Sequence, residues 1–113
     1  MIVDKFNAEN YIWGENCDGW HLLKNDKLSI ILERVSAGKC EKRHFHSKSR
    51  QFFYILKGNA AIEIEGTVHQ LKPGQGIEIP PKTPHKFMNQ SSEDVEFIVV
   101  SAPKSHGDRI ETE

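Results

Sequence analysis

The chain has 113 residues, of which 37% are apolar and 27% are charged, and its formal net charge is −1. This length suits one domain with its own core, and the near-zero charge excludes bulk electrostatic attraction to nucleic acid or to an anionic membrane. No apolar run approaches the ~20 residues of a membrane-spanning helix. The opening MIVDKFNAEN also lacks the apolar core of a secretory signal.

Short apolar segments separated by turn residues predict nine strands in one domain over residues 1–113. In chain order they span residues 20–23, 28–35, 40–46, 51–56, 60–65, 68–71, 77–79, 85–89 and 95–101. Segments rich in Gly, Pro, Asn and Asp separate them, and this spacing is typical of an all-β sandwich or barrel. The segment QFFYIL is apolar on both faces, which predicts a strand covered on both sides.

The two ends of the chain are less regular. Residues 1–19 predict an N-terminal extension or edge strand, a cover for one end of the barrel, or an arm that reaches a partner. Residues 102–113 are polar and predict a free C-terminal tail, with His106 or Arg109 closing over a pocket as the alternative. Cys17 and Cys40 leave room for one disulfide but form no disulfide framework, so we expect a reduced, cytoplasmic protein.

The segment RHFHSKSRQFFYIL, residues 43–56, carries the strongest chemical pattern. His44 and His46 alternate on one strand, so their side chains share a face roughly 6.5–7 Å apart. Two imidazoles at this separation can converge on one metal ion, although the pattern also fits a pair of surface histidines. The loop SKSR has hairpin length and would return the chain with Gln51 beside them. His85 could add a fourth group if the sheet closes on itself.

The residues around these histidines form two spaced frames. In the first, Gly38 is followed by five residues, His44-Phe45-His46, four residues, Gln51, six residues and Gly58. In the second, Gly74 is followed by five residues, Pro80, one residue, Lys82, two residues, His85, three residues and Asn89. Together they resemble the two-motif signature of the cupin family. There are two departures, at Gln51 for the first motif's glutamate and at Lys82 for the second motif's middle glycine.

The resemblance implies a cupin jelly-roll β-barrel, the double-stranded β-helix, with one divalent metal ion inside. His44, His46 and His85 map onto the histidine ligands, and Gln51 maps onto the carboxylate ligand. The ion could be Zn, Ni, Fe or Mn, which imidazole ligands alone do not distinguish. Some small cupins that open unsaturated uronic acids to linear keto acids look similar, with three histidines and a glutamine. Cupins of this size are commonly homodimers, so the resemblance also implies a homodimer.

Glutamine in place of glutamate changes the charge of the implied site. Three neutral imidazoles and a carboxylate would leave a divalent site at net +1, whereas Gln51 leaves it at +2. We expect weaker metal binding, a more acidic bound water and a preference for an anionic substrate such as a carboxylate or 2-oxo acid. The alternative is that Gln51 lies outside the ligand shell and the pocket is free of metal.

Strand parity and position predict five residues around the pocket: Phe53, Ile55, Phe87, Lys42 and Arg34. The three apolar side chains share a face with Gln51 or His85, and they also fit a simple barrel core. The two basic side chains are candidates for contacting a substrate carboxylate, or they extend into solvent. No inward-facing Asp or Glu is evident, so the general base is unassigned.

Three functions follow from these expectations. The first is a metal-dependent enzyme that acts on a small oxygenated, anionic sugar acid or keto acid by Lewis-acid isomerase chemistry, with an iron-dependent dioxygenase as the runner-up. The second is a binding module that holds a small molecule or sugar without turning it over. The third is a purely structural metal, which we rank last because structural sites usually have a closed ligand shell. We expect no nucleic-acid or membrane partner.

Overall fold

The computed structural model describes residues 2–112 and places eleven strands within them. In chain order the strands are β1 (Glu9–Trp13), β2 (Cys17–Lys24), β3 (Ser29–Val35), β4 (His44–His46), β5 (Arg50–Lys57), β6 (Ala60–Ile64), β7 (Thr67–Leu71), β8 (Gly76–Ile79), β9 (His85–Met88), β10 (Val95–Ala102) and β11 (Arg109–Glu111). The all-β prediction is confirmed. Along residues 2–112 no helix has the length and apolar character needed to cross a membrane.

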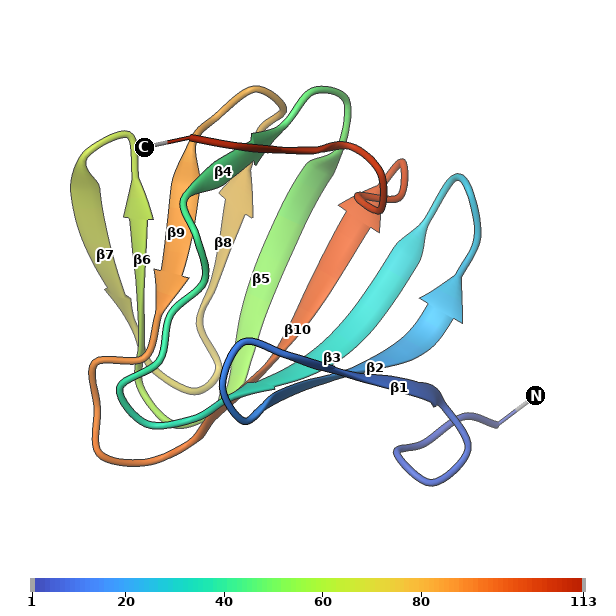
Figure 1. Ribbon diagram of the computed structural model, residues 1–113, viewed down its shortest axis with the longest axis horizontal. Helices are drawn as coiled ribbons and strands as arrows, with labels where there is room; N and C mark the ends of the chain where they lie inside the picture. Colours follow the sequence, from blue (N-terminus) through green and yellow to red (C-terminus); the bar gives the residue numbers. More distant parts are fainter. Residues whose placement is uncertain (1, 113) are drawn as a thin grey trace.

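Two antiparallel sheets enclose the core (Figure 1). The larger sheet has the strand order β1-β2-β3-β10-β5-β8, and the smaller has the order β11-β4-β9-β6-β7. Neighbouring strands in each sheet are often far apart in the sequence, as β3, β10 and β5 are. This crossing of the chain between sheets brings β4 and β9, which carry the three histidines, together at the centre of the smaller sheet.

Alternation along the central strands creates the core. On β5 the buried positions are Gln51, Phe53 and Ile55, and on β10 they alternate in the same way from Val95 to Ser101. Three phenylalanines stack between the sheets, with the rings of Phe87 and Phe97 only 4.1 Å apart and Phe53 stacked against both. The apolar positions therefore form a packed aromatic layer.

The outer face of β5 is not covered by any other part of the described chain. Phe52, Tyr54 and Leu56 are 43%, 40% and 45% exposed. The prediction that QFFYIL is covered on both sides is therefore wrong within a single chain.

Both termini are incorporated into the sheets. The N-terminal segment contributes β1, which pairs with β2 as an edge strand. The C-terminal segment contributes β11, which pairs with β4 so that Arg109 lies opposite His46. The carboxylate of Asp108 accepts hydrogen bonds from the backbone N–H groups of Lys48 and Ser49, both at 2.9 Å. The prediction of a free tail is wrong, because this anchor and the β-ladder fix the segment beside the histidines.

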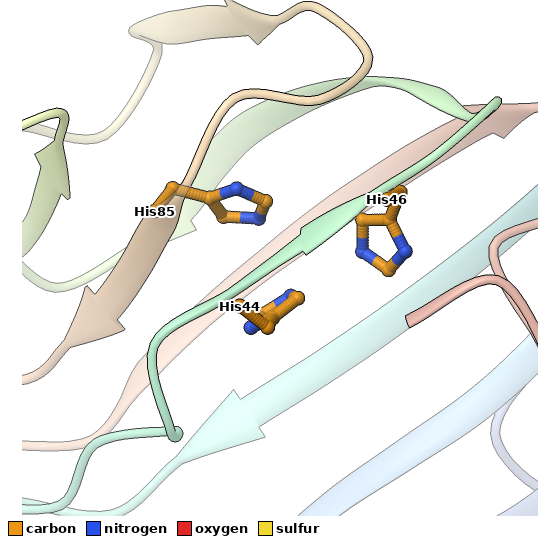
Figure 2. Close-up of side chains that lie close together, drawn as sticks. All are labelled: His44, His46 and His85. Atoms are coloured by element: carbon orange, nitrogen blue, oxygen red, sulfur yellow. The ribbon is translucent and has the colours of Figure 1, made fainter. Parts of the chain in front are cut away.

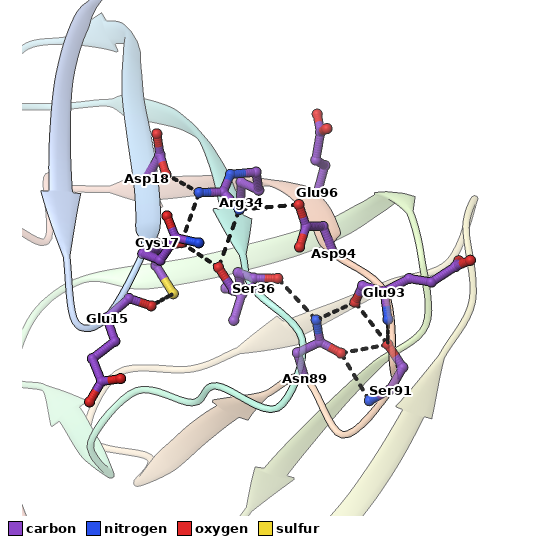
Figure 3. A network of polar contacts seen from close by, with 12 residues as sticks. Glu15, Cys17, Asp18, Arg34, Ser36, Asn89, Ser91, Glu93, Asp94 and Glu96 are labelled. Atoms are coloured by element: carbon purple, nitrogen blue, oxygen red, sulfur yellow. Dashed lines mark hydrogen bonds and ion pairs between the residues drawn. The ribbon is translucent and has the colours of Figure 1, made fainter.

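Two residues of the second sequence frame stabilise turns. Lys82 has φ 64°, so it adopts the left-handed conformation that favours glycine, and its N–H donates to the His46 carbonyl at 2.7 Å. The Lys82 departure therefore leaves the turn geometry before His85 intact. The buried amide of Asn89 donates to the carbonyls of Val35 and Glu93 at 2.9 and 2.7 Å, and so joins the end of β3 to the turn before β10 (Figure 3).

Candidate metal centre

Three buried histidines come together on the smaller sheet. The register of β4 and β9 places His44 opposite His85, and His46 follows two residues later on the same face. The ring centroid of His44 lies 4.4 Å from the ring centroid of His85 and 4.9 Å from that of His46. One nitrogen from each ring lies within 4.8 Å of the others, and Figure 2 shows the three rings grouped at one place. Three imidazoles in this arrangement can hold a metal ion.

Backbone carbonyls determine which nitrogen of two of these rings is free. Nδ1 of His44 lies 2.8 Å from the Lys42 carbonyl oxygen, and Nδ1 of His85 lies 2.9 Å from the Thr83 carbonyl oxygen. A carbonyl oxygen only accepts, so each Nδ1 carries the proton and each Nε2 retains its lone pair. Metal-binding histidines are commonly oriented in this way by a backbone carbonyl.

Burial keeps the three imidazoles neutral. It lowers the pKa of His44 to about 3 and the pKa of His46 to about 4, and it also lowers the pKa of His85. The three rings also disfavour one another's charge. Since only a neutral imidazole can donate a lone pair to a metal, the cluster is ready to bind a cation at neutral pH without first losing protons.

Gln51 places an oriented amide in the same cavity. Its Nε2 donates to the hydroxyl of Ser101 at 3.1 Å, which directs the amide oxygen away from that contact. Both Gln51 Oε1 and His85 Nε2 are buried, and neither has a hydrogen-bond partner within residues 2–112. Buried lone pairs without a donor are rare in folded proteins. An amide oxygen and an imidazole nitrogen are both able to ligate a divalent cation, so the chemistry of these residues fits a bound metal ion.

The cavity beside the histidines has a volume of about 560 Å³. Phe53 and Phe87 form part of its wall, as strand parity predicts, and Tyr11 and Trp13 of β1 extend its aromatic surface. Lys42, an exposed residue, also lines it. A cavity of this size and composition suits a small molecule with an apolar body and a few polar groups.

Two residues predicted at the pocket lie elsewhere. Ile55 is fully buried in the core and does not line the cavity. Arg34 points to the opposite side of β3, where its guanidinium pairs with Asp18 and Asp94 (Figure 3). The inward positions of β3 are Ile31, Glu33 and Val35, and Arg34 has the opposite parity, so its place agrees with the alternative that it extends away from the pocket.

The cavity is also lined by two acidic residues, Glu33 and Glu41. Sequence analysis did not identify either of them. Burial raises the pKa of Glu33 to about 7, although the Tyr11 hydroxyl donates to Glu33 Oε2 at 3.2 Å and favours the ionised form. Burial also raises the pKa of Glu41 to about 8, and the charge of Glu33 adds to this effect. The parity of β3 could have revealed Glu33, whereas Glu41 lies outside any strand and had no such signal.

Glu41 is held close to the histidines by several contacts. Its Oε1 accepts the N–H of Phe87 at 3.0 Å and lies 4.0 Å from His44 Nδ1. Its Oε2 lies 3.8 Å from the guanidinium of Arg109, which reaches the cavity from β11. The C-terminal segment therefore supplies a positive charge to the site, and the sequence-based alternative of Arg109 at the pocket describes the structure better than a free tail.

Comparisons with known proteins agree with this architecture. A family model described as a cupin domain matches residues 31–101. The uncharacterized protein MJ1618 of Methanocaldococcus jannaschii is 33% identical over 89 residues, which are 78% of this chain and 71% of that protein. Other curated relatives are longer, and the chain spans between 32% and 50% of their lengths.

Solved structures share the whole fold. The polyketide cyclase RemF from Streptomyces resistomycificus has a TM-score of 0.85 at 20% identity, over 100% of this chain and 85% of its own. A sugar phosphate isomerase of the cupin superfamily from Silicibacter pomeroyi has a TM-score of 0.79 at 18% identity, over 92% of this chain and 76% of its own. At these identities the likeness shows the fold alone. The double-stranded β-helix prediction is confirmed.

Proposed function

Because this chain belongs to the cupin family, we propose that it binds one divalent metal ion through His44, His46, His85 and Gln51 and acts on a small oxygenated metabolite. The observation that carries the proposal is the set of buried, neutral and converging imidazoles beside an amide oxygen without a donor. These groups open onto a cavity large enough for a ligand. A closed structural site would not need that space.

We propose Lewis-acid isomerase chemistry on a sugar acid or keto acid. A divalent ion in such a site polarises a carbonyl oxygen, which acidifies the neighbouring C–H bond. The chain's own contribution is to orient the ligand, with Lys42 and Arg109 at the cavity attracting a carboxylate and the aromatic wall excluding water. Gln51, being neutral, would leave the positive charge of the ion available to an anionic ligand. The sugar phosphate isomerase among the similar structures supports chemistry of this class in the fold.

Proton exchange with solvent tests this proposal. Metal-loaded protein in D₂O should transfer deuterium to the carbon next to the carbonyl of a sugar acid or keto acid substrate, and NMR would detect the loss of that proton signal. The same substrates with metal-free protein provide the control. Consumption of dissolved oxygen by iron-loaded protein would favour the dioxygenase instead. Tight binding with the ligand recovered unlabelled and unchanged would favour a binding module, and would contradict the enzymatic proposal.

We also propose that the protein is a homodimer formed through the outer face of the larger sheet. The register aligns Phe52 with Val100 and Tyr54 with Ile98, and these in turn lie beside Ile30 and Leu32 of β3. Apolar side chains thus continue across three central strands of the sheet. An apolar sheet face of this kind is normally covered, and roughly 800 Å² per protomer is typical of a stable interface. A second copy would cover it.

A charge on this face should separate the protomers. Replacing Tyr54 with lysine would place an unpaired cation in the centre of the apolar surface, so we expect the variant to be monomeric at micromolar concentration. Sedimentation velocity would measure the mass. Val68→Lys is the matched control, because Val68 is 49% exposed on the smaller sheet and its replacement should leave the dimer intact. A wild-type monomer, or dissociation by the control alone, would contradict the proposed interface.

A further inference from the structure

We propose that Glu33 is the catalytic residue that transfers the proton in this site, removing it from the ligand and returning it to a neighbouring atom. This inference rests on the proposed function and supplies the general base that the sequence left unassigned. It is carried by the position of Glu33 on the wall of the cavity and by the contacts that leave one of its oxygens free.

Glu33 is an acidic side chain at an inward-facing position of a central strand. Its neighbours on the same face of β3, Ile31 and Val35, are buried apolar residues. The strands on either side place Gly19 and Phe97 opposite it, so neither flank offers a countercharge. A carboxylate placed among apolar neighbours is unfavourable for stability. Its presence at the cavity therefore calls for a role in binding or chemistry.

One oxygen of Glu33 remains available to a ligand. Oε2 accepts the hydroxyl of Tyr11, and no group of residues 2–112 donates to Oε1 with hydrogen-bond geometry, although the indole N–H of Trp13 faces the carboxylate and favours its ionised form. Glu33 is half-buried and lines the cavity. The Tyr11 bond fixes the carboxylate in one orientation, so the free oxygen faces a defined part of the cavity. This is the geometry of a general base.

Glu41 is less suited to this role, although it lines the same cavity. Its Oε1 already accepts the backbone N–H of Phe87, and its Oε2 faces the Arg109 guanidinium. It also lies against His44, one of the proposed metal ligands. These contacts suit a group that positions the metal site and the C-terminal segment. Within residues 2–112, Glu33 forms no hydrogen bond or ion pair with any of the four proposed ligands.

The charges around Glu33 support proton transfer near neutral pH. Tyr11 faces it from β1, Glu41 from the segment before β4, and Arg109 from β11. Burial raises the pKa of Glu33 to about 7, while Tyr11 and Arg109 act in the opposite direction. A carboxyl group with a pKa near the operating pH can both accept and donate a proton efficiently.

The proposed step conserves all atoms and electrons. The ligand carries a hydroxyl group on the carbon next to its carbonyl. The C–H bond of that carbon breaks, its electron pair forms a C=C bond, the carbonyl π pair moves onto the carbonyl oxygen, and the proton forms an O–H bond with Glu33 Oε1. Glu33 then returns the proton to the former carbonyl carbon, while the hydroxyl group gives its proton to the former carbonyl oxygen and becomes the new carbonyl. The carboxylate is regenerated and the product is an isomer of the substrate. No oxidant, reductant or other co-reactant is consumed.

Glu33→Gln tests the inference while keeping the shape of the side chain and an acceptor for Tyr11. We expect metal content and ligand binding within about threefold of wild type, and a loss of deuterium exchange of roughly 10²–10⁴-fold, the usual contribution of a general base. Glu93→Gln is the matched control, because Glu93 is exposed and distant in the fold from the cavity lining. Exchange within threefold of wild type in Glu33→Gln would overturn the inference and leave the proposed function standing. Absence of exchange in wild type would overturn both.

Thermal stability of the metal-free protein gives a second readout that needs no turnover. The pKa of Glu33 is raised in the folded protein from an ordinary value of 4.5 to about 7, so folding favours its protonated form. Stability from this group is therefore complete below pH 4.5 and is lost as the pH rises towards 7. Glu33→Gln avoids that loss, so its Tm should match wild type at pH 4.5 and exceed it at pH 8. A lower Tm at both pH values would indicate a structural role and overturn the inference.

The Tyr11→Phe variant distinguishes an effect on the Glu33 carboxylate from general damage to the fold. The Tyr11 hydroxyl lowers the pKa of Glu33, so its removal should raise that pKa. We expect the acidic limb of the rate profile to move to higher pH in Tyr11→Phe. A fall in rate without movement of the acidic limb would contradict the assignment of that limb to Glu33.

Discussion

Replacing His44 with alanine should reduce the metal content from about one ion per chain to nearly none. His44 is buried, neutral and oriented by the Lys42 carbonyl, so its Nε2 is available for coordination. Loss of a group that hydrogen-bonds to a metal ligand typically weakens metal binding by roughly 10–100-fold, and loss of the ligand itself should exceed that range. Elemental analysis of protein purified without a nickel column would measure the change.

His69→Ala is the matched control for this experiment. His69 lies on β7 of the same sheet but is exposed, and it is outside the histidine cluster. Its variant should retain the ion. Iron in the wild-type protein would favour the dioxygenase, whereas zinc, nickel or manganese would favour the isomerase or a binding module. Wild-type protein that takes up none of these ions during dialysis would contradict the metal site and the enzymatic proposals that depend on it.

Chelation should also lower the stability of the wild-type protein. A ligand that binds only the folded state stabilises it by an amount that grows with its concentration relative to the Kd, about 2.7 kcal/mol at a hundredfold excess. His44→Ala should show little response to a chelator. Metal removal could lower the Tm of the wild-type protein while neither the metal-loaded nor the metal-free protein binds a small molecule. That result would show that the ion is structural, which is the role that we rank last.

Much of the strand arrangement could be predicted from the sequence, because alternation and turn residues record it locally. Eight of the predicted segments coincide with strands to within a few residues, and β4 is shorter than the 40–46 segment. Of its early residues, Cys40 pairs with Met88 only in an isolated bridge, so the continuous strand begins at His44. The histidines were predictable for a different reason. Their spacing on β4 and the frame around His85 match a family pattern, and periodicity alone would not have joined them.

The missed features depend on tertiary contacts. β11 is only three residues long and exists because β4 offers it an edge and Asp108 anchors it, neither of which is visible in the polar sequence. Glu33 could have been found by extending the parity of Ile31 along β3. The apolar outer face of β5 was visible in QFFYIL, yet the sequence did not show that this face is exposed in the folded chain.

Replacing Gln51 with glutamate should tighten metal binding by roughly 10–100-fold, which corresponds to about 1.4–2.8 kcal/mol. A carboxylate oxygen is a better donor than an amide oxygen and lowers the net charge of a divalent site from +2 to +1. The neighbouring Ser101 hydroxyl, which now accepts from Gln51 Nε2, can rotate to donate to the new carboxylate. Competition with a fluorescent chelator would measure the Kd of the metal.

The same change should weaken the binding of an anionic ligand, and this opposite sign is the informative part of the experiment. A loosened or misfolded site would lose affinity for metal and ligand together. A change in site charge raises the affinity for metal and lowers the affinity for the anionic ligand, because the ligand carboxylate then interacts with a less positive metal site. Gln70→Glu adds the same charge at an exposed position of β7, and it should change neither the affinity for metal nor the affinity for the anionic ligand. Unchanged metal affinity in Gln51→Glu would place residue 51 outside the ligand shell and leave the buried Oε1 without its proposed partner.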